Sequence, residues 1–247
     1  MNRFQSRQEE RQGPTAFFSN AQRAFRGLDV PLEKSVLDHL RNVYSTVAVG
    51  VGAATVGAGI HLFTNIFRAN FFFSLGSIFL MYKLISTPNT RENQQMRLAM
   101  FLGFCGITGL STGPLLEHVI AIDPSIVMTA LLSSTVVFGA FTLAALYAPT
   151  TKFIHLGGTL ASASLVLLIS AFFAPYKLIL FAGLALTVGF ILYDTQMIVE
   201  KNRRGDDDYV WHSVELFIDF ANMFRHILII LADKRRAEDN NRNKRRN

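Results

Sequence analysis

Long, almost uncharged apolar runs are the feature that most limits what this chain can fold into. Short polar stretches separate them, and many of the charged residues gather near the two ends of the sequence. Several runs reach the roughly 20 residues that an α-helix needs to span the hydrocarbon core of a bilayer. Because 50% of the 247 residues are hydrophobic and only 17% are charged, the distribution disfavours a water-soluble enzyme. The pattern predicts an all-α, polytopic membrane protein.

Seven apolar segments are expected to form one helical bundle. We place them at about 43–67, 71–86, 98–122, 126–147, 153–173, 178–199 and 210–231. Together they define a transmembrane domain over residues 42–232. A cytoplasmic N-terminal leader is expected over residues 1–41, and a basic C-terminal tail over residues 233–247.

The placement of Lys and Arg predicts the orientation, because cytoplasmic loops carry an excess of these residues. The leader holds seven of them, and Lys201, Arg203 and Arg204 follow the sixth segment. The loops expected on the other side are poor in them, with Arg68 and Lys177. The N-terminus is therefore expected in the cytoplasm. With seven crossings the basic tail would lie on the opposite side, against the same rule, so the side of the C-terminus stays open.

Two aspartates inside apolar segments are the strongest sign of a functional site. Asp194 lies near the end of the sixth segment, and Asp219 lies within the seventh. A carboxylate at the centre of a membrane helix costs about 2.5–3.5 kcal/mol on insertion scales, so it is rarely present for packing alone. A plain structural role, in which the two side chains only fasten helices by hydrogen bonds, is the alternative.

The seventh segment carries a stripe of polar residues. His212, Glu215, Asp219, Asn222 and His226 recur at spacings of three and four, which places them along one face of a helix. We expect His212, Glu215 and Asn222 to line the site around Asp219. Such a helix either crosses as the inner wall of the bundle or re-enters on the same side, which gives six or seven spans.

Glycine and proline indicate where helices approach or bend. Gly52 and Gly59 fall on nearly one face of the first segment, and such small residues let membrane helices come close. Gly113–Pro114 lies inside the third segment, where it predicts a kink or a break. Glu117 follows one turn later, either as a site residue that faces the bundle interior or as an acid at the interface.

Several short motifs, in this order, resemble the Bax inhibitor-1 members of the transmembrane Bax-inhibitor-motif family. The resemblance covers roughly residues 30–232. The motifs are Gly113–Pro114 with Leu116–Glu117, the run Ala145–Ala148, Tyr193–Asp194–Thr195–Gln196, and Asp208–His212 leading into Leu216–Phe220.

The resemblance implies a helical bundle of the endoplasmic reticulum membrane with a pH-sensitive calcium leak that lowers stored calcium and suppresses apoptosis. The family's pH sensor and gate, a pair of aspartates in the last two helices, falls on Asp194 and Asp219. Glu215 stands where an aspartate is expected. The resemblance implies no tightly bound cofactor, with Ca²⁺ as the transported ion and H⁺ as the regulator. Membrane lipids and cell-death regulators of the Bcl-2 class are the implied partners.

A close pair of carboxylates suggests how such a gate works. In a low-dielectric site both cannot ionise cheaply, so the pair is expected to share a proton and to hold two helices together. Ca²⁺ prefers carboxylate and carbonyl oxygens. Asp194 and Asp219, with Glu117 or Glu215, are too few acids for a tight site, which suits weak binding of Ca²⁺ in transit.

Two other functions compete with a channel. Tyr193–Asp194 is similar to one motif of aspartate-dependent intramembrane proteases, but the Gly-x-Gly-Asp motif of that class is absent around Asp219, so we expect no enzyme. A non-conducting scaffold that suppresses cell death through protein partners remains the main alternative. The net charge of +6 comes largely from the tails and indicates topology and attraction to lipid surfaces, not nucleic-acid binding.

Overall fold

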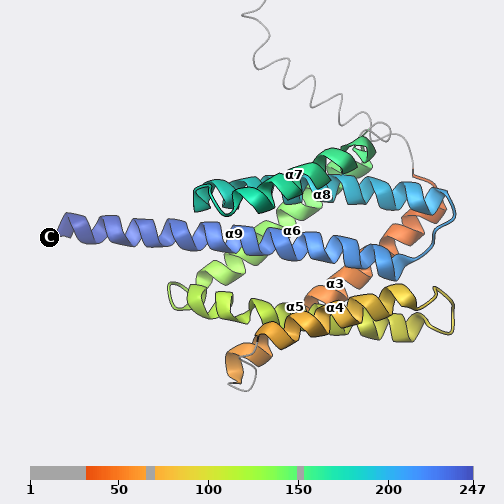
Figure 1. Ribbon diagram of the computed structural model, residues 1–247, viewed down its shortest axis with the longest axis horizontal. Coiled ribbons are helices and arrows are strands. Elements are labelled where there is room, and N and C mark those ends of the chain that lie inside the picture. Colours follow the sequence, from red (N-terminus) through yellow and green to blue (C-terminus); the bar gives the residue numbers. More distant parts are fainter. Residues whose placement is uncertain (1–31, 65–69, 149–152, 247) are drawn as a thin grey trace, which may run out of the picture.

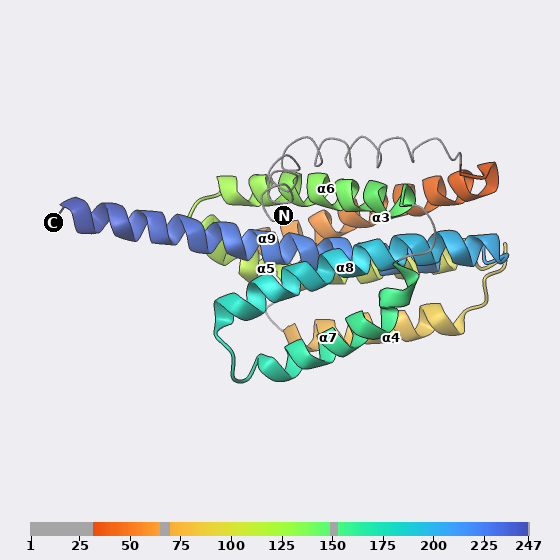
Figure 2. The ribbon, with the colours of Figure 1, turned by 90° about the horizontal axis from the view of Figure 1, so that it is seen from above.

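The computed structural model describes residues 32–64, 70–148 and 153–246 (Figures 1 and 2). Outside its loops the chain is helical in these ranges. No strand occurs in these ranges, so the prediction of an all-α fold is confirmed. Most of the expected leader lies outside them. The described part forms α3 (Lys34–Phe63), α4 (Asn70–Ser86), α5 (Gln94–Ile120), α6 (Ser125–Leu146), the 3₁₀ helix η2 (Ile154–Leu156), α7 (Gly157–Ser170), α8 (Tyr176–Arg203) and α9 (Tyr209–Arg246).

The length and composition of the helices confirm a polytopic membrane protein. By these two criteria α3, α5, α6 and α8 can each cross a membrane, and shorter apolar stretches occupy residues 75–86 and 154–170. Large apolar side chains such as Val136 on α6 and Leu168 on α7 are mostly exposed. Such an apolar outer surface is expected of helices that face lipid instead of water.

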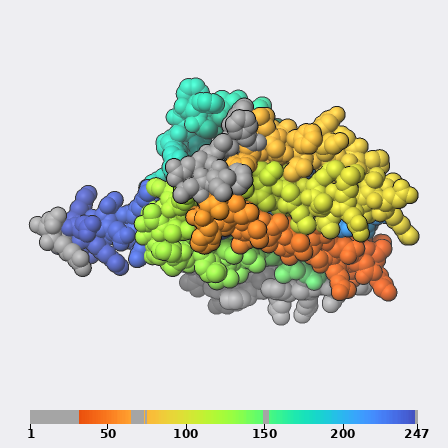
Figure 3. Space-filling view, turned by 90° about the horizontal axis from the view of Figure 1, so that it is seen from below, coloured from red at the N-terminus to blue at the C-terminus, as the bar shows by residue number. Residues whose placement is uncertain are grey.

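Helix α9 runs through the middle of the bundle and contacts α3, α5, α6 and α8 (Figures 1 and 2). Just before its start, Asp208 pairs with Arg97 of α5, and near its other end Arg235 lies 3.3 Å from Asp123 in the α5–α6 turn. The helix is unbroken between these contacts, so it extends along the bundle as one continuous element. Its last turns project beyond the other helices (Figure 3).

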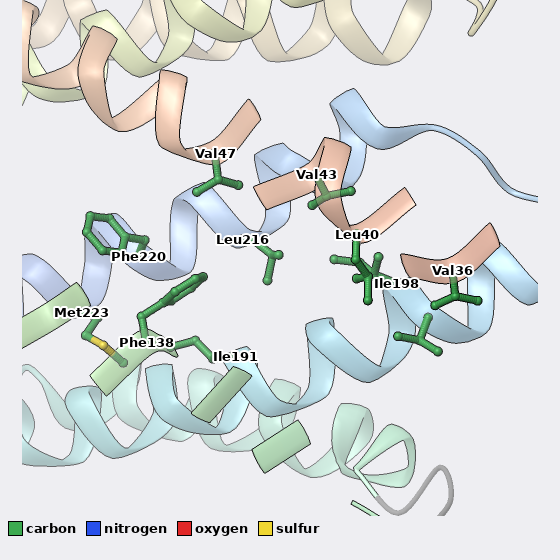
Figure 4. Close-up of a cluster of buried hydrophobic side chains, with 11 residues drawn as sticks. Val36, Leu40, Val43, Val47, Phe138, Ile191, Ile198, Leu216, Phe220 and Met223 are labelled. Carbon is green, nitrogen blue, oxygen red and sulfur yellow. The ribbon is translucent and has the colours of Figure 1, made fainter. Parts of the chain in front are cut away.

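The largest buried apolar cluster joins α3, α6, α8 and α9 (Figure 4). On α9, Leu216, Phe220 and Met223 share one face because they are three and four residues apart. The ring of Phe220 meets the edge of Phe138 with centroids 5.5 Å apart. This packing holds α8 against α9 and so positions the candidate site between them. The buried members are Val36, Leu40, Val43, Val47, Phe138, Ile191, Ile198, Val199, Leu216, Phe220 and Met223.

Close packing of α3 on α5 depends on glycines, but not on the two that the sequence suggested. Among described atoms, a Cβ added at Gly52 or Gly59 would meet nothing within 4 Å, so that expectation is wrong. A Cβ at Gly57 would overlap the carbonyl oxygen of Gly106 on α5. The two backbones therefore touch one another along the face that carries Gly57, not the one that carries Gly52 and Gly59.

Helix α5 passes through Pro114 without a break, although the sequence allowed either a kink or a break there. The preceding Gly113 is buried, and a Cβ at this position would overlap the ring of His61 on α3. The turn around the proline thus stays packed against α3. The freed carbonyl that proline leaves in a helix is tolerated when neighbouring helices cover it.

Candidate functional site around Asp194 and Asp219

The structure brings Asp194 of α8 and Asp219 of α9 together. Their carboxyl groups lie within hydrogen-bonding reach of each other in the interior of the bundle. Asp219 is only 6% exposed. An ionised carboxylate accepts hydrogen bonds but donates none, so a direct bond between the two groups requires a proton on one of them. The arrangement is therefore suited to a single shared proton.

Core packing places both side chains at this contact. Asp194 follows Ile191 by three residues and precedes Ile198 by four, so it shares their inward face of α8. Asp219 likewise follows Leu216 by three residues and precedes Met223 by four on α9. Because these neighbours belong to the main apolar cluster, the two carboxyl groups lie among apolar side chains.

Hydroxyl groups from three other positions gather near Asp219. Tyr44 of α3 faces Thr142 of α6 and Thr195 of α8, and it also faces the Asp219 carboxyl group. The three hydroxyl oxygens and Asp219 Oδ2 are buried without a hydrogen-bond partner in the described structure. Buried polar atoms in proteins are nearly always paired, directly or through ordered water. These four oxygens, one from each of four helices, form a polar cluster inside the bundle.

Sequence reasoning missed Tyr44 and Thr142. Tyr44 lies near the start of an apolar segment and Thr142 lies inside another, and single hydroxyl groups are common in such segments. Nothing in the local pattern of either segment distinguishes these two positions. Only the way in which the helices assemble brings them to the aspartates.

Glu215, expected in the lining of the site, forms an ion pair with Lys201 near the end of α8. Lys201 Nζ lies 2.9 Å from Glu215 Oε1 and 3.3 Å from Oε2. Glu215 is one turn before Asp219, and its charge acts on both aspartates. The ion pair therefore places a compensating positive charge between the candidate site and the α8–α9 loop.

His212 joins α9 to α3 instead of lining the aspartate pair. Its Nδ1 lies 2.9 Å from His39 Nε2, in a buried contact between the two rings. The other ring nitrogen lies 3.7 Å from Asp206 Oδ2. His212 is seven residues from Asp219, a rise of about 10 Å along a helix. It belongs to the end of the bundle that carries the α8–α9 loop.

Glu117 and Asn222 also lie away from the pair. The Glu117 side chain is 57% exposed and lies 3.5 Å from His61. The paired residues Arg97 and Asp208 mark one common level of the bundle. From this level Glu117 is 20 residues, about 30 Å, along α5, whereas Asp219 is only about 16 Å along α9. Asn222 accepts a hydrogen bond from a neighbouring arginine and faces a groove between α4, α5 and α9.

The acids that do meet cannot enclose a metal ion. Among the residues that the structure describes, no group of three or more His, Cys, Asp and Glu side chains is arranged to hold one. Ca²⁺ takes about six to eight oxygen ligands, and two carboxylates supply only a part of that set. The hydroxyl groups of Tyr44, Thr142 and Thr195 add neutral oxygens nearby, and the arrangement suits weak contact with a hydrated ion.

Comparison with known proteins gives a consistent result. A family model described as "Inhibitor of apoptosis-promoting Bax1" matches residues 36–236. The chain is 42% identical to Bax inhibitor 1 of Homo sapiens over 205 residues, 80% of this chain and 86% of that protein. It is 44% identical to probable Bax inhibitor 1 of Paralichthys olivaceus over 201 residues, 78% of this chain and 85% of that protein.

A plant protein is similar over an even larger part of the chain. The identity to Bax inhibitor 1 of Arabidopsis thaliana is 35% over 224 residues, 86% of this chain and 89% of the plant protein. The matched residues include α4 to α8 in full, nearly all of α3, most of α9 and both aspartates of the candidate site. The chain therefore belongs to the Bax inhibitor-1 family, whose members are polytopic membrane proteins and not enzymes.

Proposed function

We propose that this protein is a pH-sensitive calcium leak channel of the endoplasmic reticulum membrane, with Asp194 and Asp219 as its gate. The observation that carries the proposal is the contact between the two carboxyl groups inside the bundle, near three buried hydroxyl oxygens. Ca²⁺ is the transported ion and H⁺ the regulator, and no tightly bound cofactor is needed. Lowered calcium stores would then link the channel to the suppression of apoptosis.

The proposed gate opens and closes by a change in helix packing. While the pair holds one proton, the hydrogen bond between Asp194 and Asp219 fastens α8 to α9. Loss of the proton leaves two negative charges in contact, which repel one another. Since α9 also contacts α3, α5 and α6, its displacement changes the packing of the whole bundle.

The positive charges support an orientation with the start of α3 in the cytoplasm. Asp208, which precedes α9, pairs with Arg97 near the start of α5, so the α4–α5 and α8–α9 loops lie at the same end of the bundle. Those loops and the helix ends beside them carry Arg91, Lys201 and Arg203. Basic residues in short loops are typical of the cytoplasmic side, so the loops carry this orientation, although residues 234–246 at the other end of α9 are also basic.

Calcium efflux from liposomes tests the proposal directly. We would reconstitute the wild type, Asp194→Asn and Asp219→Asn and measure Ca²⁺ efflux at several values between about pH 5 and pH 8, where a coupled carboxylate pair can titrate. Asparagine keeps the size of the side chain but cannot ionise. Glu92→Gln, an exposed acid in the α4–α5 loop, is the control.

The wild type and the control should leak Ca²⁺ with the same dependence on pH, and both aspartate variants should lose that dependence. A pH profile that survives in Asp219→Asn would reject the aspartate gate. No flux above that of empty liposomes at any pH would reject the channel itself.

The projecting end of α9 favours a second candidate function, a scaffold that acts on cell death through protein partners (Figures 1 and 3). Residues 240–245 are exposed, and three of these six residues are basic. Regulators of the Bcl-2 class are the proposed partners. Removal of the residues after Arg236 should then abolish protection from cell death while it leaves Ca²⁺ efflux unchanged. A loss of both together would favour the channel.

A further inference from the structure

Arg225 lies on α9 among the helices of the bundle, and the hydrogen-bond partners of its guanidinium are neutral side chains. Its Nε donates to Thr112 Oγ1 at 3.2 Å, and its Nη1 donates to Asn222 Oδ1 at 3.4 Å. In the described part of the chain no carboxylate forms an ion pair with it. A guanidinium has five N–H donors, so most of them remain free. Cations inside membrane proteins are usually paired, which leaves an anion to be found for Arg225.

A groove between α4, α5 and α9 has this arginine in its lining. Its volume is about 800 Å³, within the range of about 300–1,000 Å³ that small-molecule sites occupy. Ile78, Tyr82 and Ile85 of α4 form its outer wall and are 65%, 66% and 61% exposed. The groove is therefore open toward the surface of the bundle that faces lipid. Ser111 of α5 adds a polar group to its inner wall.

The groove has the length and the polarity of a lipid site. Arg225 is 16 residues from Tyr209, or about 24 Å along α9, in a hydrocarbon core of about 30 Å. Its guanidinium thus lies toward the far side of the membrane from the α8–α9 loop. Ile85 lies in the last turn of α4, next to the α4–α5 loop. The apolar wall formed by α4 therefore runs from the level of Arg225 back toward the middle of the membrane.

We propose that this groove binds an anionic phospholipid of the surrounding membrane. The lipid phosphate pairs with Arg225, whose planar fork of donors matches phosphate geometry. Asn222 and Ser111 contribute neutral hydrogen-bonding groups beside it. One acyl chain lies along Ile78, Tyr82 and Ile85. The site is separate from the aspartate pair, and the proposal does not depend on the channel function.

Photo-cross-linking in lipid nanodiscs tests this site. The full chain is placed in phosphatidylcholine nanodiscs with a small fraction of phosphatidic acid that carries a diazirine in its acyl chain, and labelled peptides are located by mass spectrometry. The same diazirine on phosphatidylcholine is the lipid control. Phosphatidic acid should label α4 and α9 residues of the groove, and Arg225→Gln should reduce this labelling about tenfold, the expected effect of one charge-assisted contact.

A second variant separates the groove from the charge. Ile78→Trp adds bulk at the exposed groove wall and should lower the labelling by both lipids, while Val136→Trp, at a 70% exposed position on α6, should not. If Arg225→Gln fails to fold, the labelling of Arg225→Lys and of Ile78→Trp by the two lipids still tests the site. Equal labelling by both lipids in the wild type, or labelling that Arg225→Gln leaves unchanged, would overturn the proposal. Loss of labelling in millimolar inorganic phosphate would show a site for small anions instead of lipid.

Discussion

Arg97 and Asp208 form a two-point ion pair that ties the start of α9 to α5. Arg97 Nη1 lies 2.8 Å from Asp208 Oδ1, and Nη2 lies 2.6 Å from Oδ2. Asp208 Oδ1 also accepts the backbone N–H of Trp211 at 3.0 Å, as an N-cap residue does. The Asp208 carboxylate thus caps the start of the central helix and also fixes the position of that helix along the bundle axis. Because Asp219 lies on that helix, the ion pair also supports the position of the candidate gate.

Loss of this ion pair should destabilise the protein strongly. Arg97 is 3% exposed, and removal of one member of a buried ion pair typically costs about 3–5 kcal/mol, because the other charge is left without a partner. Arg97→Gln should therefore lower the midpoint of thermal unfolding in detergent by many degrees. Arg204→Gln, which removes a 76% exposed arginine paired with Glu200, should change it little. Equal midpoints for the two variants would contradict this reading of the structure.

The glycines of α3 allow a prediction with a matched control on the same helix. Gly57→Ala places a Cβ against the carbonyl oxygen of Gly106, so α3 and α5 must separate. Such overpacking costs about 1–3 kcal/mol or more. Gly52→Ala meets no described atom within 4 Å and should stabilise the helix by about 0.5–1 kcal/mol through its lower backbone entropy. Chemical or thermal unfolding of the two variants should shift in opposite directions.

The sequence predicts the helices well because membrane span lengths follow directly from the apolar runs. The second span, expected at about residues 71–86, is observed as Asn70–Ser86. The sequence does not predict which face of a helix meets which neighbour. For this reason it indicated Gly52 in place of Gly57 for the close contact.

The same limit applies to the candidate site. Asp194 and Asp219 were identifiable because a carboxylate is unusual in an apolar run. Tyr44 and Thr142 were not, because a hydroxyl group in an apolar helix is common and their positions next to Asp219 depend on four helices at once. Glu117 lies in a similar sequence context to the aspartates, yet the structure places it at the exposed end of α5.

The turn between α5 and α6 gives a pH dependence outside the membrane helices. Hydrogen bonds from the Ser125 hydroxyl and backbone N–H to Asp123, aided by Arg235, lower the pKa of the Asp123 carboxyl below its usual 3.8. A lowered pKa means that the stabilisation is present above the usual value and is lost as the pH falls through the folded-state value. Between about pH 6 and pH 3 the unfolding midpoint of the wild type should therefore fall more than that of Asp123→Asn. Parallel curves would show that this contact adds nothing.

The last prediction concerns Lys201, whose ion pair with Glu215 lies one helical turn from Asp219. Lys201→Met leaves Glu215 as a third negative charge near the aspartate pair. Removal of the shared proton then becomes harder, because the product would hold one more uncompensated negative charge. The midpoint of the pH profile of Ca²⁺ efflux should therefore move to a higher pH, whichever form of the pair conducts.

Two further variants make this test specific. Glu215→Gln removes the negative charge and should move the same midpoint to a lower pH. Lys177→Met removes an exposed lysine from the first turn of α8, at the other end of that helix, and should leave the midpoint unchanged. Because the two changes at the Lys201–Glu215 pair are expected to act in opposite directions, a general loss of stability cannot produce both. A shift of the same sign in Lys201→Met and Glu215→Gln would mean that the pair acts through helix packing and not through its charge.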